Sequence, residues 1–445
     1  MARPGQRTVR ARRTKVAGTI RLHVAFRIPS WASRAGWAVL DYGLFALAGM
    51  VVNVLLARGL TQGAYGAYAV SFAVYMIVFV VHSALFAEPM LVLAAQRFRE
   101  QTRAYLSILL RAHLLFSLAL VALAGVIAAL DIGDPELRRA LFCMALAAPF
   151  MNLVQLLRRV CYGLWSTRAA AIGALAYLLL LTAAMAALQA LGSLGLATGY
   201  AALGGASALV AAGYWLRTTR AADTAGAPQF REVVSAHLAF ARYGVGTALL
   251  GWVPQNLWYV ALPLVLRGPA ELGPSGHLRA LVNLVQPMLQ VNGALSTLLV
   301  PTFTRKLASD PHATPWRIAA WMTGLSALYA PALVLLGPLA NQLLYRGAYP
   351  SPALTWWTLG AVPACYALYS SLRAYSLARE QPELPLWATI HAALGSLTLG
   401  LGLCTWRALE GAALAMLLGY GLSAASLATL LAQRRNTRPS SERAA

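Results

Sequence analysis

The chain has 445 residues, of which 59% are hydrophobic and 11% charged, and its mean hydropathy is +0.62. A soluble domain carries about 25% charged residues, so this composition excludes a soluble globular protein and indicates a polytopic membrane protein. The formal net charge of +22 does not indicate nucleic-acid binding, because the basic residues gather beside apolar segments in the way that cytoplasmic loops do.

Twelve apolar segments are long enough to cross the hydrocarbon core, which takes roughly 20 residues in a helix. Their predicted bounds, in chain order, are 35 to 57, 66 to 95, 104 to 130, 138 to 157, 169 to 190, 195 to 216, 238 to 265, 278 to 302, 316 to 338, 352 to 372, 385 to 405 and 411 to 432. The first segment is too long for a secretory signal, and no small-residue cleavage site follows it. We therefore expect a retained first helix.

The distribution of Lys and Arg predicts the orientation, since loops rich in these residues stay in the cytoplasm. Most of the 36 basic residues lie before the first segment, after the last one, and in every second connection between them. Arg97, Arg99 and Arg103, for example, follow the second segment. The pattern predicts that both termini are cytoplasmic, and it suggests that the basic leader contacts anionic membrane lipids.

An internal repeat divides the chain into two halves. The first segment contains "LDYGLFALAGMVVN" and the seventh contains "ARYGVGTALLGWVPQN", so that Asp41 in one half corresponds to Arg242 in the other. The next segment of each half begins near Gly66 or Gly276. Six helices plus six, both halves entering from the cytoplasm, predict two lobes related by a pseudo-twofold axis along the membrane normal, with a cavity between them.

The predicted organisation has five parts. They are a basic cytoplasmic tail (1 to 34), an N-terminal six-helix lobe (35 to 216), a cytoplasmic linker (217 to 237), a C-terminal six-helix lobe (238 to 432) and a cytoplasmic C-terminal tail (433 to 445). The connections on the outer side are all short, which leaves no room for a folded external domain.

Motifs for catalysis are missing from the sequence. The two lysines, Lys15 and Lys306, stand in no phosphate-binding loop, and there is no HExxH or G-x-S-x-G motif. The four cysteines lie singly, which is typical of packing residues and not of a disulfide or metal site. We therefore expect no enzymatic activity, no metal and no cofactor.

Three stretches resemble a known family. "LLARGLTQGAYGAYAVSFAVY" (55 to 75), "LFAEPMLVLAAQRF" (85 to 98) and "LVPTFTRKLA" (299 to 308) are similar to segments of the Wzx-type polysaccharide flippases, in the multidrug/oligosaccharidyl-lipid/polysaccharide (MOP) superfamily. The resemblance implies an all-α, MATE-like fold in a bacterial inner membrane. It also implies a flippase that moves undecaprenyl-pyrophosphate-linked oligosaccharide from the cytoplasmic to the periplasmic leaflet by alternating access, for O-antigen or exopolysaccharide synthesis.

The same resemblance implies a coupling ion, proton or sodium, and partners among other membrane proteins of polysaccharide assembly. Two alternatives stay open at this stage. One is a cation-coupled multidrug exporter of the same superfamily, which would need a net acidic cavity. The other is a membrane-embedded transferase or polymerase, which would need an external catalytic loop that the sequence does not contain.

Four charged residues fall in the inner half of predicted spans: Asp41, Glu88, Arg111 and Arg242. Ionisable side chains at this depth usually face an aqueous cavity or pair with one another. One interpretation places Asp41 and Arg242 in a cytoplasmic-side cavity or gate, where Arg111 supplies positive potential for the pyrophosphate. Glu88 would then pair with an arginine or take up the coupling proton or sodium ion. The other interpretation is that these residues extend to the headgroups or form fixed ion pairs.

Amide side chains form a second candidate set. Asn283, Gln286 and Gln290 are spaced to lie in one narrow stripe of the eighth helix, suited to sugar hydroxyls. Asn256 lies close to the face of Arg242 in the seventh helix, which favours a lining role for both. Hydrogen bonding between helices is the alternative for these amides. We expect His82, His113 and Asn53 to be structural.

Overall fold

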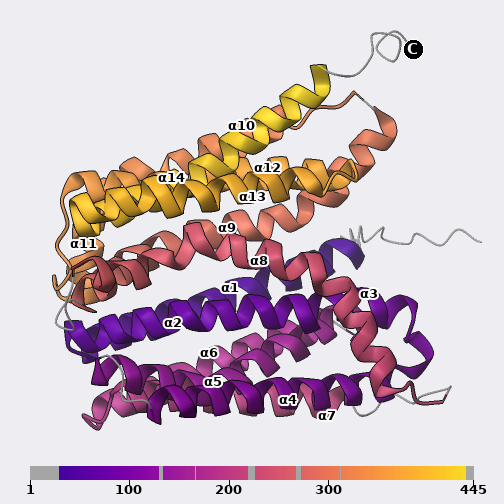
Figure 1. The fold of residues 1–445 in the computed structure, drawn as a ribbon, viewed down its shortest axis with the longest axis horizontal. Coiled ribbons are helices and arrows are strands. Elements are labelled where there is room, and N and C mark those ends of the chain that lie inside the picture. Colours follow the sequence, from indigo (N-terminus) through magenta and orange to yellow (C-terminus); the bar gives the residue numbers. More distant parts are fainter. Residues whose placement is uncertain are drawn as a thin grey trace, which may run out of the picture.

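The structure is a computed structural model that describes residues 30–129, 134–165, 167–218, 226–266, 272–310 and 312–436. Within these ranges every regular element is a helix. The helices run roughly parallel to one another in two stacked lobes (Figure 1). Most of the two predicted tails lies outside the described residues.

The N-terminal lobe has a core of α1 with α6 and α5 with α7, against which α2 and α4 pack. Its helices are α1 (Ser30–Gly59), α2 (Gln62–His82), α3 (Glu88–Gln96), α4 (Thr102–Ala129), α5 (Pro135–Val160), α6 (Thr167–Ala190) and α7 (Leu196–Thr218). Side-chain caps fix two of the helix starts: Thr61 accepts a hydrogen bond from the backbone N–H of Ala64, and Asp134 accepts one from Leu137.

The C-terminal lobe has α12 at its centre, in contact with α9, α10, α11 and α14. Its helices are α8 (Phe230–Leu266), α9 (Gly273–Ser309), α10 (Trp316–Ala327), α11 (Tyr329–Tyr345), α12 (Ala353–Ala378), α13 (Glu383–Gly395) and α14 (Leu401–Asn436). Helix α14 contains a sharp kink at Ala408, where φ is 46°. The two lobes meet where α1 and α2 pack against α8 and α9.

The chain is a multi-pass membrane protein. Among the described residues, nine helical stretches are long and apolar enough to cross a membrane. One of them, Glu383–Arg434, has 52 residues, about 78 Å of helix, and includes the kink at Ala408. Helix α9 is long enough but is not among the nine, because its amide and basic side chains lower its hydropathy. The predicted count of twelve spans therefore stays a prediction.

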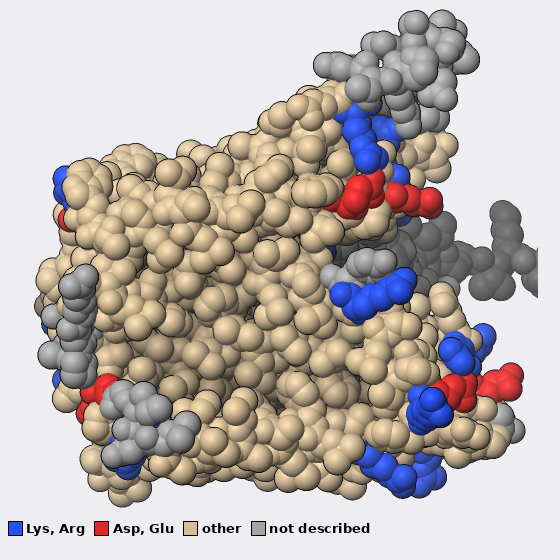
Figure 2. All heavy atoms as spheres, in the orientation of Figure 1, with Lys and Arg blue, Asp and Glu red and all other residues tan. Residues whose placement is uncertain are grey.

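Charged side chains are concentrated at the two ends of the molecule, and most of the basic ones lie at the end that includes α3 and the last turns of α14 (Figure 2). Between the ends lies a broad belt of uncharged residues (Figure 2). A concentration of basic residues at one end is the pattern that the positive-inside rule describes, and the orientation expected from the sequence stays a prediction. We refer to this basic end as the inner end and to the opposite one as the outer end.

Helix α8 starts earlier than expected and belongs partly to the other lobe. It begins at Phe230, inside the predicted linker, and the side chain of Val233 is buried in an apolar cluster with Phe86, Met90 and Leu106 of the N-terminal lobe. The later turns of α8 contact α13 and α14. A single helix therefore carries the chain from one lobe to the other.

A π-helical turn, Ser83–Ala87, interrupts the helical path between α2 and α3 just before Pro89. Pro89 has no N–H to donate to the carbonyl of Leu85, four residues earlier. The Nδ1–H of His237, on α8, donates to this carbonyl over 2.8 Å, and its Nε2 accepts a hydrogen bond from the Tyr105 hydroxyl at 2.7 Å. The Leu85 carbonyl, which Pro89 leaves without its helical donor, thus has a hydrogen-bond partner on α8, across the junction with the N-terminal lobe.

Candidate functional site

A pocket of about 680 Å³ lies between the lobes. Its walls come from α1 and α2 of the N-terminal lobe and from α8, α9 and α14. The volume falls within the range of roughly 300–1,000 Å³ that small-molecule sites occupy. The pocket is therefore large enough for part of a carbohydrate headgroup.

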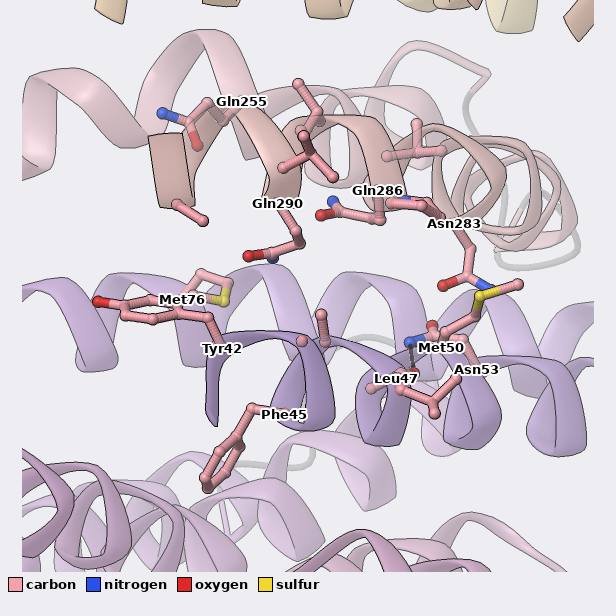
Figure 3. A pocket seen from close by; sticks show the side chains of 18 of the residues that line it. Tyr42, Phe45, Leu47, Met50, Asn53, Met76, Gln255, Asn283, Gln286 and Gln290 are labelled. Carbon is pink, nitrogen blue, oxygen red and sulfur yellow. Dashed lines mark hydrogen bonds between the residues drawn. The ribbon is translucent and has the colours of Figure 1, made fainter. Parts of the chain in front are cut away.

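The amides predicted from the sequence line this pocket. Asn256 of α8 and Asn283, Gln286 and Gln290 of α9 are all lining residues, together with Gln255. Asn283, Gln286 and Gln290 lie on the side of α9 that faces α1 (Figure 3). Asn283 is held in place by donating to the Tyr345 hydroxyl over 2.9 Å, whereas Gln290 is exposed to the pocket.

The other amide of α9, Asn292, points away from the pocket. It is buried, donates to the carbonyl of Pro363 over 3.1 Å and accepts from Ser326 at 3.1 Å. Asn292 thus fastens α9 to α12 and α10. The stripe of Asn283, Gln286 and Gln290 is separate from this packing face.

One charged side chain, Arg279, is present among the described lining residues, and no acidic one is. Its Nε donates to the side-chain amide oxygen Oδ1 of Asn53 over 2.9 Å. Its guanidinium carbon lies 4.5 Å from the centre of the Phe72 ring and 5.8 Å from that of Tyr259. Sequence reasoning missed this residue and placed it at the edge of an outer loop. It also assigned Asn53 a structural role alone, although Asn53 lines the pocket.

Apolar residues form the inner part of the pocket wall. Val39 of α1 and Val291, Leu295 and Leu298 of α9 line the pocket toward the inner end and are each 38% to 50% exposed. Exposed apolar residues on two adjacent helices of a membrane protein are suited to contact acyl chains. The pocket is therefore polar toward the outer end and apolar at its inner margin.

Asp41 does not line the pocket but is fully buried behind its wall. Its carboxylate forms a salt bridge with Arg158 at 2.7 Å and accepts hydrogen bonds from the Arg158 Nε and the Tyr162 hydroxyl. The Arg158 guanidinium also stacks on Tyr42 and Phe45, 4.8 Å and 4.3 Å from the ring centres, and both rings line the pocket. In this structure Asp41 is part of a fixed ion pair, which is the second of the two interpretations drawn from the sequence.

Arg158 is the second residue that sequence reasoning missed. The predicted fourth span ended at residue 157, which put Arg158 in the cytoplasmic connection. Helix α5 instead continues to Val160 and carries Arg158 into the lobe. The sequence held a partial signal, because a carboxylate inside a span needs a cation at similar depth. Arg158 stands at the inner end of another span, although the sequence does not show which spans are neighbours in space.

Glu88 and Arg242 are both exposed and lie outside the pocket lining. The Glu88 carboxylate lies beside α8, where one of its oxygens is 3.8 Å from the position of a Cβ built on Gly244. Arg242 is two residues earlier on the same helix and does not pair with Asp41, which binds Arg158 instead. Neither Asp41 nor Arg242 therefore lines this pocket, and a role of the two residues in a cytoplasmic-side gate stays a prediction.

Arg111 differs from its predicted position. It is exposed on α4, and Leu114, Leu115 and Leu118, three, four and seven residues later, are 57% to 58% exposed on the same helix face. Such an apolar face contacts lipid, so Arg111 lies on the outside of the N-terminal lobe and not at the pocket. An arginine there extends its guanidinium along the helix toward the headgroups.

The histidines take the structural position that was expected. His82 and His113 are buried, and the Nε2 of His82 lies 2.9 Å from the Nδ1 of His113. Phe86 and Phe116 pack around the His82 ring. The pair joins α2 to α4 within the N-terminal lobe.

The lobes are in close contact at the outer end. Gly66 of α2 and Gly276 of α9 cross so closely that a Cβ on Gly276 would lie 2.9 Å from the Gly66 nitrogen. Nearby, the Tyr349 hydroxyl donates to the carbonyl of Ala57 over 3.2 Å, and Arg58 donates to carbonyls at the end of α11. We call this set of contacts the outer closure.

Comparisons with known proteins identify the fold. No family model matches the chain, and no curated protein matches its sequence. The structure is similar to an inward-facing multidrug resistance transporter of the MATE family, in the MOP superfamily, with a TM-score of 0.69 and 13% identity over 90% of this chain and 100% of that one.

It is also similar to the lipid II flippase MurJ in an inward closed conformation, with a TM-score of 0.66 and 15% identity over 90% of this chain and 87% of that one. A MOP superfamily transporter from Pyrococcus furiosus, whose reversed pocket polarity suggests a different function, gives a TM-score of 0.58 and 12% identity over 90% and 94% of the two chains. The chain therefore has the fold of MOP superfamily transporters, in agreement with the predicted fold class.

Proposed function

We propose that this protein is a flippase that moves undecaprenyl-pyrophosphate-linked oligosaccharide from the cytoplasmic to the periplasmic leaflet by alternating access. The observation that carries the proposal is the lining of the pocket, with six amide side chains and one arginine and no carboxylate among its described residues. Amides hydrogen-bond to sugar hydroxyls, and arginine binds acidic groups. A sugar headgroup cannot cross hydrocarbon without such partners, because each unpaired polar group costs several kcal/mol.

The apolar inner margin supports an amphiphilic substrate. Val39 on α1 and Leu295 on α9 are exposed where the inner margin of the pocket meets the outside of the bundle. A lipid chain attached to a headgroup in the pocket can remain in the membrane at this margin, so the protein has to shelter only the polar part. The outer closure and the basic end then correspond to a conformation that receives substrate from the cytoplasmic side.

A multidrug exporter is the alternative that the fold also allows, since one of the similar structures is a MATE transporter. Cationic drugs need carboxylates or exposed aromatic faces in their binding site. Arg279 in this pocket repels a cation, and the Asp41 carboxylate behind the wall is already paired with Arg158. The rings of Tyr42 and Phe45 already face Arg158, and those of Phe72 and Tyr259 already face Arg279. The electrostatics of the pocket therefore favour a neutral or anionic substrate.

The test is to delete the protein in its native host and to determine on which leaflet lipid-linked oligosaccharide accumulates. Accumulation on the cytoplasmic leaflet, reversed by the intact gene and not by a Gln286→Leu/Gln290→Leu variant that is made in normal amounts, is the expected result. Unchanged sidedness together with increased sensitivity to cationic drugs would overturn the proposal and favour the exporter.

A further inference from the structure

Among the described residues, no carboxylate pairs with the cation of Arg279. None of the ion pairs formed between described residues includes Arg279, whose partners are the Asn53 amide and the rings of Phe72 and Tyr259. Removing a guanidinium from water without a counter-ion is costly, and neutral amides and rings offset that cost only in part. A pocket that keeps such a residue is prepared for an anion.

The position of Arg279 along α9 is as informative as its charge. Arg279 lies six residues after the outer start of α9, and Asn283, Gln286 and Gln290 follow toward the inner end. Leu295, in the apolar margin, is 16 residues after Arg279, which corresponds to about 24 Å of helix. Arg279 and the apolar margin are thus at opposite ends of the pocket.

Helix α1 runs in the opposite direction to α9 and also has a polar lining residue at its outer end and an apolar one at its inner end. Asn53, which binds Arg279, is 14 residues after Val39, and both line the pocket. That spacing corresponds to about 21 Å of helix. Helix α1 therefore places its amide, Asn53, beside Arg279 at the outer end and the apolar Val39 at the inner end, in agreement with the order along α9.

This order fixes how an amphiphilic substrate lies in the pocket. The lipid leaves through the apolar margin, and the pyrophosphate is bonded directly to the lipid, so the pyrophosphate also lies near the margin. A group about 24 Å away along α9 is too far to contact it. The part of the substrate that reaches Arg279 is a sugar several units from the lipid, with the intervening sugars against the amide stripe.

We propose that Arg279, held between Asn53, Phe72 and Tyr259, is a specificity subsite for a negatively charged substituent, a carboxylate or a phosphate, on a sugar remote from the lipid. This inference rests on the proposed function and narrows its substrate class to acidic oligosaccharides. The planar guanidinium forms paired hydrogen bonds with such oxyanions, whereas a hydroxyl in the same place accepts only one. Arg279 therefore distinguishes an acidic glycan from a neutral one of the same length.

Arg279 also bonds to Asn53 across the lobes, so a substitution at Arg279 alters the contact between lobes as well as the charge. The two effects separate with a matched control. Tyr349→Phe removes another interlobe hydrogen bond, the one to the Ala57 carbonyl outside the pocket lining, and keeps the cation, whereas Arg279→Gln removes the cation and keeps a side chain able to donate to Asn53. Only the second substitution is expected to change the preference for acidic substrates.

The experiment uses full-length protein in proteoliposomes and two undecaprenyl-pyrophosphate-linked oligosaccharides that differ only in the terminal sugar, glucuronic acid or glucose. Wild-type protein is expected to move the acidic substrate faster. Arg279→Gln is expected to slow the acidic substrate about 10-fold to 100-fold, the range for losing a charged hydrogen bond, and to leave the neutral one nearly unchanged. In Tyr349→Phe the ratio of the two rates is expected to stay at the wild-type value. A terminal sugar phosphate tests the phosphate arm in the same way.

Each other outcome has a definite meaning. If wild-type protein moves both substrates at equal rates, or if Arg279→Gln slows both equally, the subsite is overturned and the flippase function stands. If wild-type protein moves neither substrate, the proposed function itself fails. Should Arg279→Gln not fold, competition with soluble glucuronate-terminated and glucose-terminated oligosaccharides decides on wild-type protein: stronger inhibition by the acidic one is expected, and equal inhibition refutes the subsite.

Discussion

Substituting Gly66 with alanine tests the outer closure directly. A Cβ on Gly66 would lie 1.9 Å from the carbonyl oxygen of Leu272 and 2.4 Å from its carbonyl carbon. The clashing atoms belong to the backbone, so no side-chain rotation relieves the contact. To reach 3.4 Å, where ordinary contact begins, α2 and the start of α9 must separate by about 1.5 Å.

The energetic effect follows from which conformation contains the contact. Overpacking of this kind costs roughly 1–3 kcal/mol. Gly66 is in one lobe, and Leu272 immediately precedes α9 in the other. Only the conformation in which the lobes touch at the outer end therefore bears the cost. A change of about 1–3 kcal/mol shifts the two-state equilibrium about 5-fold to 150-fold toward the conformation open at the outer end.

The assay is a distance measurement between spin labels at exposed outer positions, Leu191→Cys and Leu354→Cys, in a background without the four native cysteines. Gly66→Ala is expected to enlarge the population with the longer distance. Gly205→Ala is the control, because a Cβ there meets nothing within 4 Å, and it is expected to leave the distances unchanged. An unaltered distance distribution in folded Gly66→Ala protein would refute the assignment of these glycines to the closure.

Three further predictions test other parts of the account. Asp41→Asn leaves the Arg158 cation buried without its partner and is expected to lower the free energy of unfolding in detergent by about 3–5 kcal/mol. Most of this loss is expected to be recovered in Asp41→Leu/Arg158→Met, which removes both charges. Equal stability of wild type and Asp41→Asn would contradict the buried ion pair. Gln286→Ala is expected to slow translocation without changing thermal stability. Asn292→Ala is expected to lower the free energy of unfolding by about 1–3 kcal/mol, because it leaves buried polar groups unpaired. A loss of stability in Gln286→Ala with normal translocation would show that the stripe is structural. Arg111→Leu is expected to leave translocation within about twofold of wild type, and a strong loss of flux would return this residue to the pocket.

The fold was predictable because its signals are repeated along the chain. The long apolar segments require membrane helices, and the alternation of arginine-rich loops separates the two ends of the molecule. The correspondence of Gly66 with Gly276 was also visible, although the sequence did not show that these residues meet at one crossing. The stripe of Asn283, Gln286 and Gln290 depends only on helical spacing, and the structure places all three at the pocket.

The charged part of the site was harder to predict, because small errors in helix ends change the assignment of a residue completely. Arg158 and Arg279 stand within a residue or two of predicted span ends, and each lies deeper because its helix extends further. Arg111 has the depth of a cavity residue but the wrong helix face, which only the packing of α4 reveals. The partner of Asp41 depended on which helices are neighbours, and hydropathy carries no information about that.

The most direct test of the central claim, that the pocket between the lobes holds the headgroup of a lipid-linked oligosaccharide, is photocrosslinking in cells that make the substrate. A photoreactive amino acid is placed at Gln286, in the pocket, or at Leu335, which is 78% exposed on the outside of α11. The account predicts a light-dependent adduct that carries glycan at Gln286 and none at Leu335. A protein that is present in the membrane and gives no glycan adduct at Gln286, or gives equal adducts at both positions, would contradict it.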